Sequence, residues 1–69
     1  MLETFVVKGA DVAALARTLD KTVNQFMNEC TEEGVIVKTV FPPQITSYTG
    51  YRGGHFFVLL QQLELNYPD

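Results

Sequence analysis

The sequence is poor in the residues that hold small proteins together covalently or through a metal. It has one cysteine, Cys30, and one histidine, His55. A lone cysteine has no partner for an internal disulfide, and the pair cannot supply the ligands of a structural zinc site. A chain of 69 residues buries only about 60% of the surface that its unfolded form exposes. Because association is the remaining way to stabilise so small a core, we expect one domain, spanning 1–69, that forms a homo-oligomer.

Basic residues are also few, since five Lys and Arg stand against eight Asp and Glu, for a net charge of −3. Nucleic acids and anionic membrane surfaces both require clustered cations, so neither a nucleic-acid polymer nor a membrane is an expected partner. The first residues, Met1–Thr4, lack the basic and apolar regions of a signal peptide. No apolar run approaches the roughly 20 residues that span a bilayer. With a free Cys30, these features predict a cytoplasmic protein.

Hydrophobic periodicity predicts one helix and three strands. Apolar residues at helical spacing follow Asp11, a good N-cap, and Gly34 can supply the positive φ that ends the turn after the helix. Segments rich in β-branched and aromatic residues predict the strands, and Pro42-Pro43 is expected to end the second one. The expected elements are a strand at 2–8, a helix at 11–30, a strand at 35–41, a loop at 42–54 and a strand at 55–65.

This order predicts an α+β fold in which the single helix packs on a three-stranded, mostly antiparallel sheet of order 2-3-1. The strand at 55–65 is the most hydrophobic and is placed in the centre. Its alternating faces carry Phe57, Leu59, Gln61, Leu63 and Leu65 on one side and Phe56, Val58 and Leu60 on the other. One helix covers only one face, so we expect a second copy of the chain to cover the other. The alternative is that the loop at 42–54 folds back over it.

The segment after Pro42-Pro43 concentrates aromatic, basic and glycine residues. From Gly34 to Leu63 the sequence has no acidic residue, and Arg52 is the only charge between Lys38 and Glu64. Tyrosine rings stack on planar ligands, arginine binds phosphate, glycine lets backbone N–H groups approach an anion, and histidine can donate to a phosphate. The candidate ligand-binding residues are Tyr48, Tyr51, Arg52, Gly53, Gly54 and His55. They predict capture of an anionic, nucleotide-like small molecule near a subunit boundary; the alternative is that this loop is only a connector.

No residue pattern predicts catalysis, and no cofactor or metal is expected. Cys30 falls on the apolar helix face and is expected to be a core residue rather than a nucleophile paired with His55. Ser47 with His55 has no supporting motif, and the adjacent carboxylates of Glu32 and Glu33 project in different directions. We therefore expect a binding protein that is not an enzyme. The alternative is an adaptor that binds a larger protein through a sheet edge or a helix face.

The segment VNQFM at 23–27, followed by EEGVIV at 32–37, resembles a pattern in short sporulation-associated bacterial proteins. The similarity covers residues 2–41, has a fainter continuation at 56–60 and ends at the tyrosine- and glycine-rich loop. The resemblance implies a β-α-β-β plan and a small cytoplasmic protein, and it supplies no catalytic residues. By analogy of size and oligomeric design alone, the loop suits a phage-encoded protein that sequesters a host signalling nucleotide.

Overall fold

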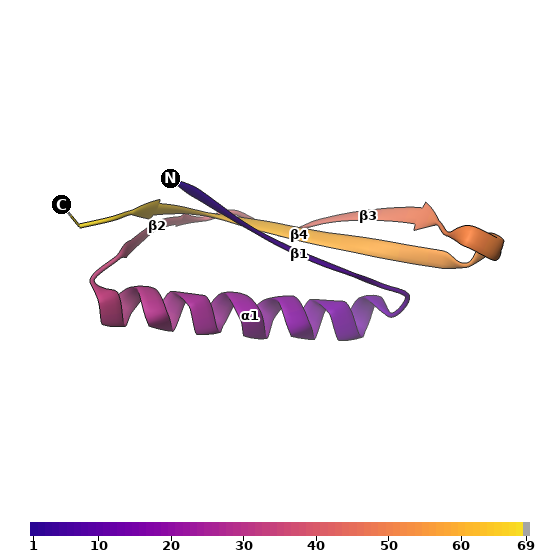
Figure 1. The fold of residues 1–69 in the computed structure, drawn as a ribbon, viewed down its shortest axis with the longest axis horizontal. Coiled ribbons are helices and arrows are strands. Elements are labelled where there is room, and N and C mark those ends of the chain that lie inside the picture. The colour runs from indigo at the N-terminus through magenta and orange to yellow at the C-terminus, as the bar shows by residue number, and fades with distance from the viewer. Residues whose placement is uncertain (69) are drawn as a thin grey trace.

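The computed structural model of the chain describes residues 1–68. One helix lies against one face of a four-stranded sheet, and the hairpin of the last two strands extends past the end of the helix (Figure 1). The molecule is therefore elongated, with extents of 50 × 18 × 17 Å. The elements are β1 (Leu2–Gly9), α1 (Val12–Glu33), β2 (Ile36–Val40), β3 (Gln44–Thr49), a 3₁₀ turn (Tyr51–Gly53) and β4 (His55–Asn66).

Both ends of α1 are capped by the residues that the sequence suggests. The Asp11 carboxylate accepts a hydrogen bond from the Ala14 N–H at 3.2 Å, which satisfies one exposed donor of the first turn. Gly34 takes the left-handed conformation with φ 76°, and the Val35 N–H donates to the Cys30 carbonyl at 2.8 Å. The positive φ of Gly34 is thus confirmed. The helix ends at Glu33 rather than Cys30, because Gly34 is the first residue that leaves the helical conformation.

β4 is the central strand, and every other strand pairs with it in antiparallel fashion. β1 pairs along one edge, opposite residues 57–64. β2 and β3 follow each other along the opposite edge, where they pair with 63–66 and 55–60. The α+β class, the single helix and the central position of the last strand are confirmed.

The predicted three-stranded sheet is wrong, because the segment predicted as a loop at 42–54 contains the strand β3. Pro42 and Pro43 lack N–H groups and interrupt the ladder, but the chain resumes pairing with β4 directly after them. β3 extends the sheet at its edge. The alternative that this segment folds back over the second sheet face is therefore also wrong.

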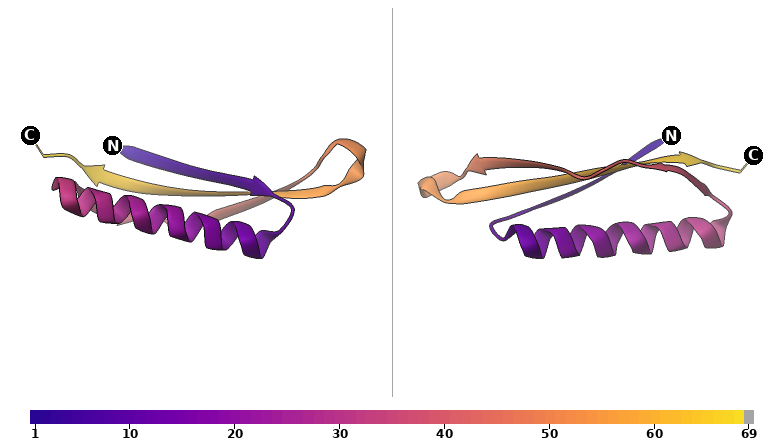
Figure 2. Two further views of the ribbon diagram at one scale, coloured as in Figure 1. Left: turned by 60° about the horizontal axis from the view of Figure 1, so that its bottom comes forward. Right: turned by 180° about the vertical axis from the view of Figure 1, so that it is seen from behind.

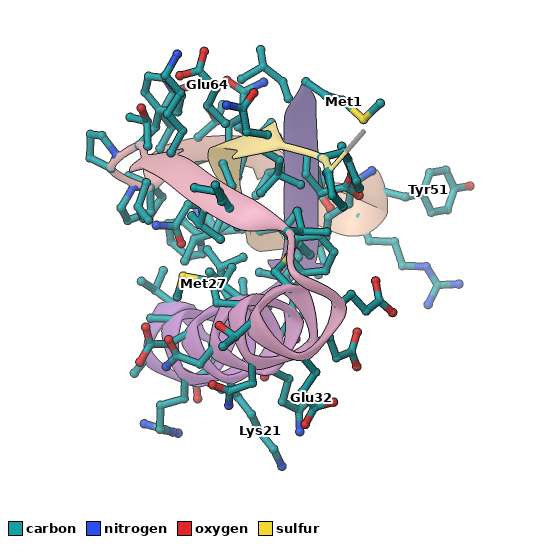
Figure 3. The ribbon with its side chains drawn as sticks, turned by 90° about the vertical axis from the view of Figure 1, so that its left-hand side faces the viewer. Met1, Lys21, Met27, Glu32, Tyr51 and Glu64 are labelled. Atoms are coloured by element: carbon teal, nitrogen blue, oxygen red, sulfur yellow. The ribbon has the colours of Figure 1, made fainter. Side chains whose placement is uncertain are left out.

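The core lies between α1 and the sheet, as the end-on view shows (Figure 3). Its buried residues are Leu19, Val23, Cys30, Val35, Leu59, Leu63 and Leu65. Partly buried side chains enclose them, including Phe5 and Phe26, whose rings meet edge to face at 5.1 Å. All seven buried residues belong to this one layer, so the opposite face of the sheet contributes none.

Leu63→Ala tests this core, because Leu63 has no exposed surface. The substitution removes buried methyl groups and leaves a cavity, at a cost of about 2–5 kcal/mol. In so small a domain we expect a large fall in the thermal midpoint, measured by circular dichroism. Val40→Ala, at a side chain that is 49% exposed, is the control and should cost about 1 kcal/mol or less. Equal destabilisation by the two variants would contradict this assignment of the core.

Candidate functional site

The candidate residues of the sequence all lie at the tip of the β3–β4 hairpin, beyond the end of α1 (Figure 2). The turn between the strands is closed by two backbone hydrogen bonds. The Gly50 N–H donates to the Gly54 carbonyl at 2.8 Å, and the Gly53 N–H donates to the Gly50 carbonyl at 3.1 Å. The structure thus gathers the six residues at one end of the molecule.

Strand register divides these residues between the two faces of the hairpin. Tyr48 pairs with Phe56, and Thr49 pairs with His55. Paired residues share a face and successive residues alternate, so Tyr48 lies on the uncovered face and His55 on the face that α1 covers farther along. Tyr51 lies in the turn between them. Within one copy, a ligand on either face therefore meets Tyr48 or His55, but not both.

The tyrosine and glycines next to the turn pack around Phe56. The rings of Tyr48 and Phe56 are stacked, with centroids 5.6 Å apart and planes inclined by 24°. A Cβ on Gly50 would collide with the Phe56 ring, and one on Gly54 would approach it to 3.0 Å. These two glycines therefore make room for Phe56. The sequence predicted a role for Gly54 only through its backbone N–H, and this packing against Phe56 was not predicted.

The outermost part of the hairpin presents an aromatic ring and a cation to solvent. Tyr51 is 94% exposed and projects away from the sheet (Figure 3). Arg52 has φ 73° and is the one non-glycine residue with positive φ in the part of the chain that the structure describes. Gly53 continues this conformation with φ 78°. A side chain costs about 1 kcal/mol in the left-handed region, where glycine is favoured.

The charges of the chain are separated along its length. Glu29, Glu32 and Glu33 lie in the last turns of α1, at the end of the molecule opposite the hairpin tip (Figure 1). The hairpin from Gln44 to Leu63 carries Arg52 and no carboxylate. An anion approaching the tip therefore meets a local positive charge on a protein of net negative charge.

A groove of about 370 Å³ opens between α1 and the sheet. It lies beside Pro43, where the edge ladder is interrupted between β2 and β3. Its lining residues are Ala16, Arg17, Leu19 and Asp20 from α1, and Pro43, Leu59 and Gln61 from the sheet side. No local sequence pattern predicts this groove, because it is made by residues that only the tertiary structure brings together.

The structure separates Cys30 from His55. Cys30 lies near the end of α1 away from the hairpin, whereas His55 begins β4 at the tip. Only 4% of Cys30 is exposed, and its burial, with the nearby charges of Glu33, Glu29 and Glu3, raises the pKa of its thiol. Within residues 1–68, no group of three or more His, Cys, Asp or Glu is arranged to hold a metal ion. In the same range, no helix is both long and apolar enough to cross a membrane.

Cys30 should therefore react slowly with Ellman's reagent near neutral pH. Its raised pKa lowers the thiolate fraction, and its burial limits access, so native protein should react at least about tenfold more slowly than denatured protein. A Cys30→Ala variant carrying Thr18→Cys, at an exposed helix position, supplies the control thiol. If native Cys30 reacted as fast as this control, the burial of the thiol would be contradicted.

Comparison of the chain with protein-family models, curated proteins and solved structures found no match. The resemblance of residues 2–41 to sporulation-associated proteins stays a prediction, as does the analogy with phage proteins.

Proposed function

We propose that the protein is a non-catalytic homo-oligomer that captures an anionic, nucleotide-like small molecule at the hairpin tip, near a subunit boundary. The observation that carries this proposal is the turn, where exposed Tyr51 precedes Arg52 in a conformation that favours glycine. Backbone strain of this kind clusters at ligand-binding and active sites. A glycine would relieve the strain at this position, and arginine is present instead.

Arg52 and Tyr51 offer two complementary contacts. The planar guanidinium of Arg52 can donate a pair of hydrogen bonds to a phosphate, and the ring of Tyr51 can stack on a base. Tyr48 or His55 adds a further contact, depending on the face of the hairpin from which the ligand approaches. A nucleotide carries both a phosphate and a planar ring, so it matches the two groups of the turn.

The need for an oligomer follows from the sheet face opposite α1. In the part of the chain that is described, no segment covers this face (Figure 2). Its apolar residues include Leu2 and Val6 of β1, which are 55% and 48% exposed, and Ile36 of β2, which is 62% exposed. Phe56, Val58 and Leu60 of β4 lie on the same face, and hydrogen-bonded polar side chains separate them from Leu2 and Ile36; these are Thr4 with Gln62 and Thr39 with Glu64. The group around Val6, Phe56, Val58 and Leu60 is the apolar patch that a second copy would cover, since such patches on monomers are often interaction sites.

The size of this face indicates how much of it a second copy must cover. The 12 residues of β4 span about 40 Å, and the strands beside it widen the face to about 10–15 Å. The resulting area is about 500 Å² per copy, or about 1,000 Å² in a pair, which is near the lower limit for a specific interface. A face-to-face pair must therefore use the hairpin as well as the body, and this brings the tip to the subunit boundary.

An adaptor that binds a larger protein is the second candidate function. It is supported by the outer edge of β3, whose residues are all exposed. A partner strand could add to this edge through backbone hydrogen bonds. In that case Arg52→Gly should leave the binding of the partner unchanged, since the turn would only connect two strands.

Arg52→Gly tests the ligand site while preserving the turn, because glycine relieves the strain of a positive φ. Titration calorimetry with a panel of nucleotides and cyclic nucleotides should detect binding to the wild-type protein. A hydrogen bond to a charged group contributes about 1.5–3 kcal/mol, so the variant should bind about 10- to 100-fold more weakly.

Lys38→Ala removes one positive charge outside the tip and is the matched control, for which we expect unchanged affinity. Absence of heat with every nucleotide in the panel would contradict the proposed function. Equal weakening by Lys38→Ala would show that net charge, rather than the turn, governs binding.

Val6→Lys tests the uncovered sheet face. A buried ammonium group is costly, so the variant should shift towards a smaller assembly in light scattering at micromolar concentration, with an unchanged circular dichroism spectrum. Gln25→Lys places the same charge on the exposed side of α1 and should leave the size unchanged. A monomeric wild-type protein would contradict the oligomer, and an unchanged size of the Val6 variant would exclude this face as the interface.

A further inference from the structure

The sheet has two outer edges that differ in charge. β1 forms one edge and carries Glu3 and Lys8, and charged residues protect an edge strand against pairing with other chains. β3 forms part of the other edge and has the sequence Gln-Ile-Thr-Ser-Tyr-Thr, which contains no charge and no proline. All of its residues are exposed. β3 thus lacks the usual protection of an edge strand.

The hydrogen bonds around β4 show which groups of β3 face outward. The Phe41 N–H donates to the Gln62 carbonyl at 3.0 Å, and the Gly50 N–H donates to the Gly54 carbonyl at 2.8 Å. The backbone N–H and C=O groups of the even-numbered β4 residues therefore point toward the side of β4 on which β2 and β3 lie. In an antiparallel ladder every second pair of opposite residues is hydrogen-bonded. Even-numbered residues of β3 lie opposite even-numbered residues of β4, so their backbone groups bond to β4. The backbone N–H and C=O groups that point away from β4 belong to Ile45, Ser47 and Thr49.

We propose that β3 of a second copy occupies this edge, in antiparallel orientation about a two-fold axis at Ser47. This register sets Ile45 of each copy opposite Thr49 of the other and satisfies every outward-facing backbone group of the three residues. On the other face it sets Thr46 opposite Tyr48, a favourable cross-strand combination. Because β3 is uncharged, pairing with itself brings no like charges together. The pairing leaves the apolar sheet face available for a separate interface.

The same register assigns a role to the groove beside α1. The paired strands end at Thr49, and the strand direction beyond that residue brings the turn that carries Tyr51 towards Pro43 of the other copy, which lines the groove. The hairpin tip of each copy thus lies beside the groove of its partner. Arg17 in the groove adds a second cation to Arg52, beside the carboxylate of Asp20, while the exposed side chains of Ala16 and Pro43 supply apolar surface for a planar ring. This composite site rests on the proposed function, whereas the edge pairing does not.

Cysteine cross-linking tests the edge pairing without any ligand. In a Cys30→Ala background, Ser47→Cys places two thiols at the two-fold axis, with Cα atoms about 5.5 Å apart, which suits a disulfide. Mild oxidation should yield a covalent dimer on a non-reducing gel. Thr49→Cys in the same background is the control, because its two copies lie about 13 Å apart in this register. Failure of Ser47→Cys to cross-link, or equal cross-linking of the control, would overturn the pairing.

Ser47→Pro and Arg17→Ala then test the composite site. Proline at an outward-facing N–H leaves the ladder to β4 intact and blocks the edge. Both variants should bind the nucleotide identified by calorimetry about tenfold more weakly, whereas Lys21→Ala, at an exposed helix position, should bind normally. If Ser47→Cys cross-links but Ser47→Pro and Arg17→Ala both bind the nucleotide normally, the composite site is refuted and the site at the hairpin tip stands. If no nucleotide binds the wild-type protein, the composite site fails together with the proposed function, and cross-linking alone decides the edge pairing.

Discussion

The structure depends on the pairing of β4 with every other strand. Its 12 residues span about 40 Å, and they hold β1 on one edge and β2 and β3 in succession on the other. α1, with 22 residues, is about 33 Å long and is displaced toward the end of the sheet that carries β2 (Figure 1). The first part of β4 therefore leaves the two-layer body as a hairpin. The elongated shape and the position of the candidate site both result from this displacement.

Local sequence patterns predicted the helix and the central strand, because the hydrophobic residues that mark them lie within the elements themselves. The apolar spacing of α1, the N-cap Asp11 and the C-terminal Gly34 identify the helix, and the hydrophobicity of 55–65 identifies the central strand. β3 was missed because its residues are all exposed, so no alternation of buried and exposed positions marks it as a strand. Its conformation depends on the ladder that β4 offers, which is a tertiary effect. Pro42-Pro43 follows the end of β2, but pairing along the same side of β4 resumes at Gln44 in β3.

The sequence predicted where the candidate site lies but not how its side chains are arranged. The absence of carboxylates around Arg52 and the nearby tyrosines and glycines pointed to the hairpin tip. The division of Tyr48 and His55 between two faces depends on strand register, which the sequence left open. The packing of Gly50 against Phe56 depends on the same register. The groove at Pro43 requires α1 and the broken edge to meet, so no local pattern indicates it.

In a single copy of the chain, the groups proposed to bind a ligand face water. Tyr51 is 94% exposed, and an exposed arginine gains little from a phosphate because water screens the attraction. A second copy placed over the tip would exclude part of that water and strengthen the contact. By linkage, a ligand held between copies would in turn stabilise the assembly relative to the separate chains. In the proposed assembly, association would therefore both cover the exposed sheet face and shield the proposed binding groups from water.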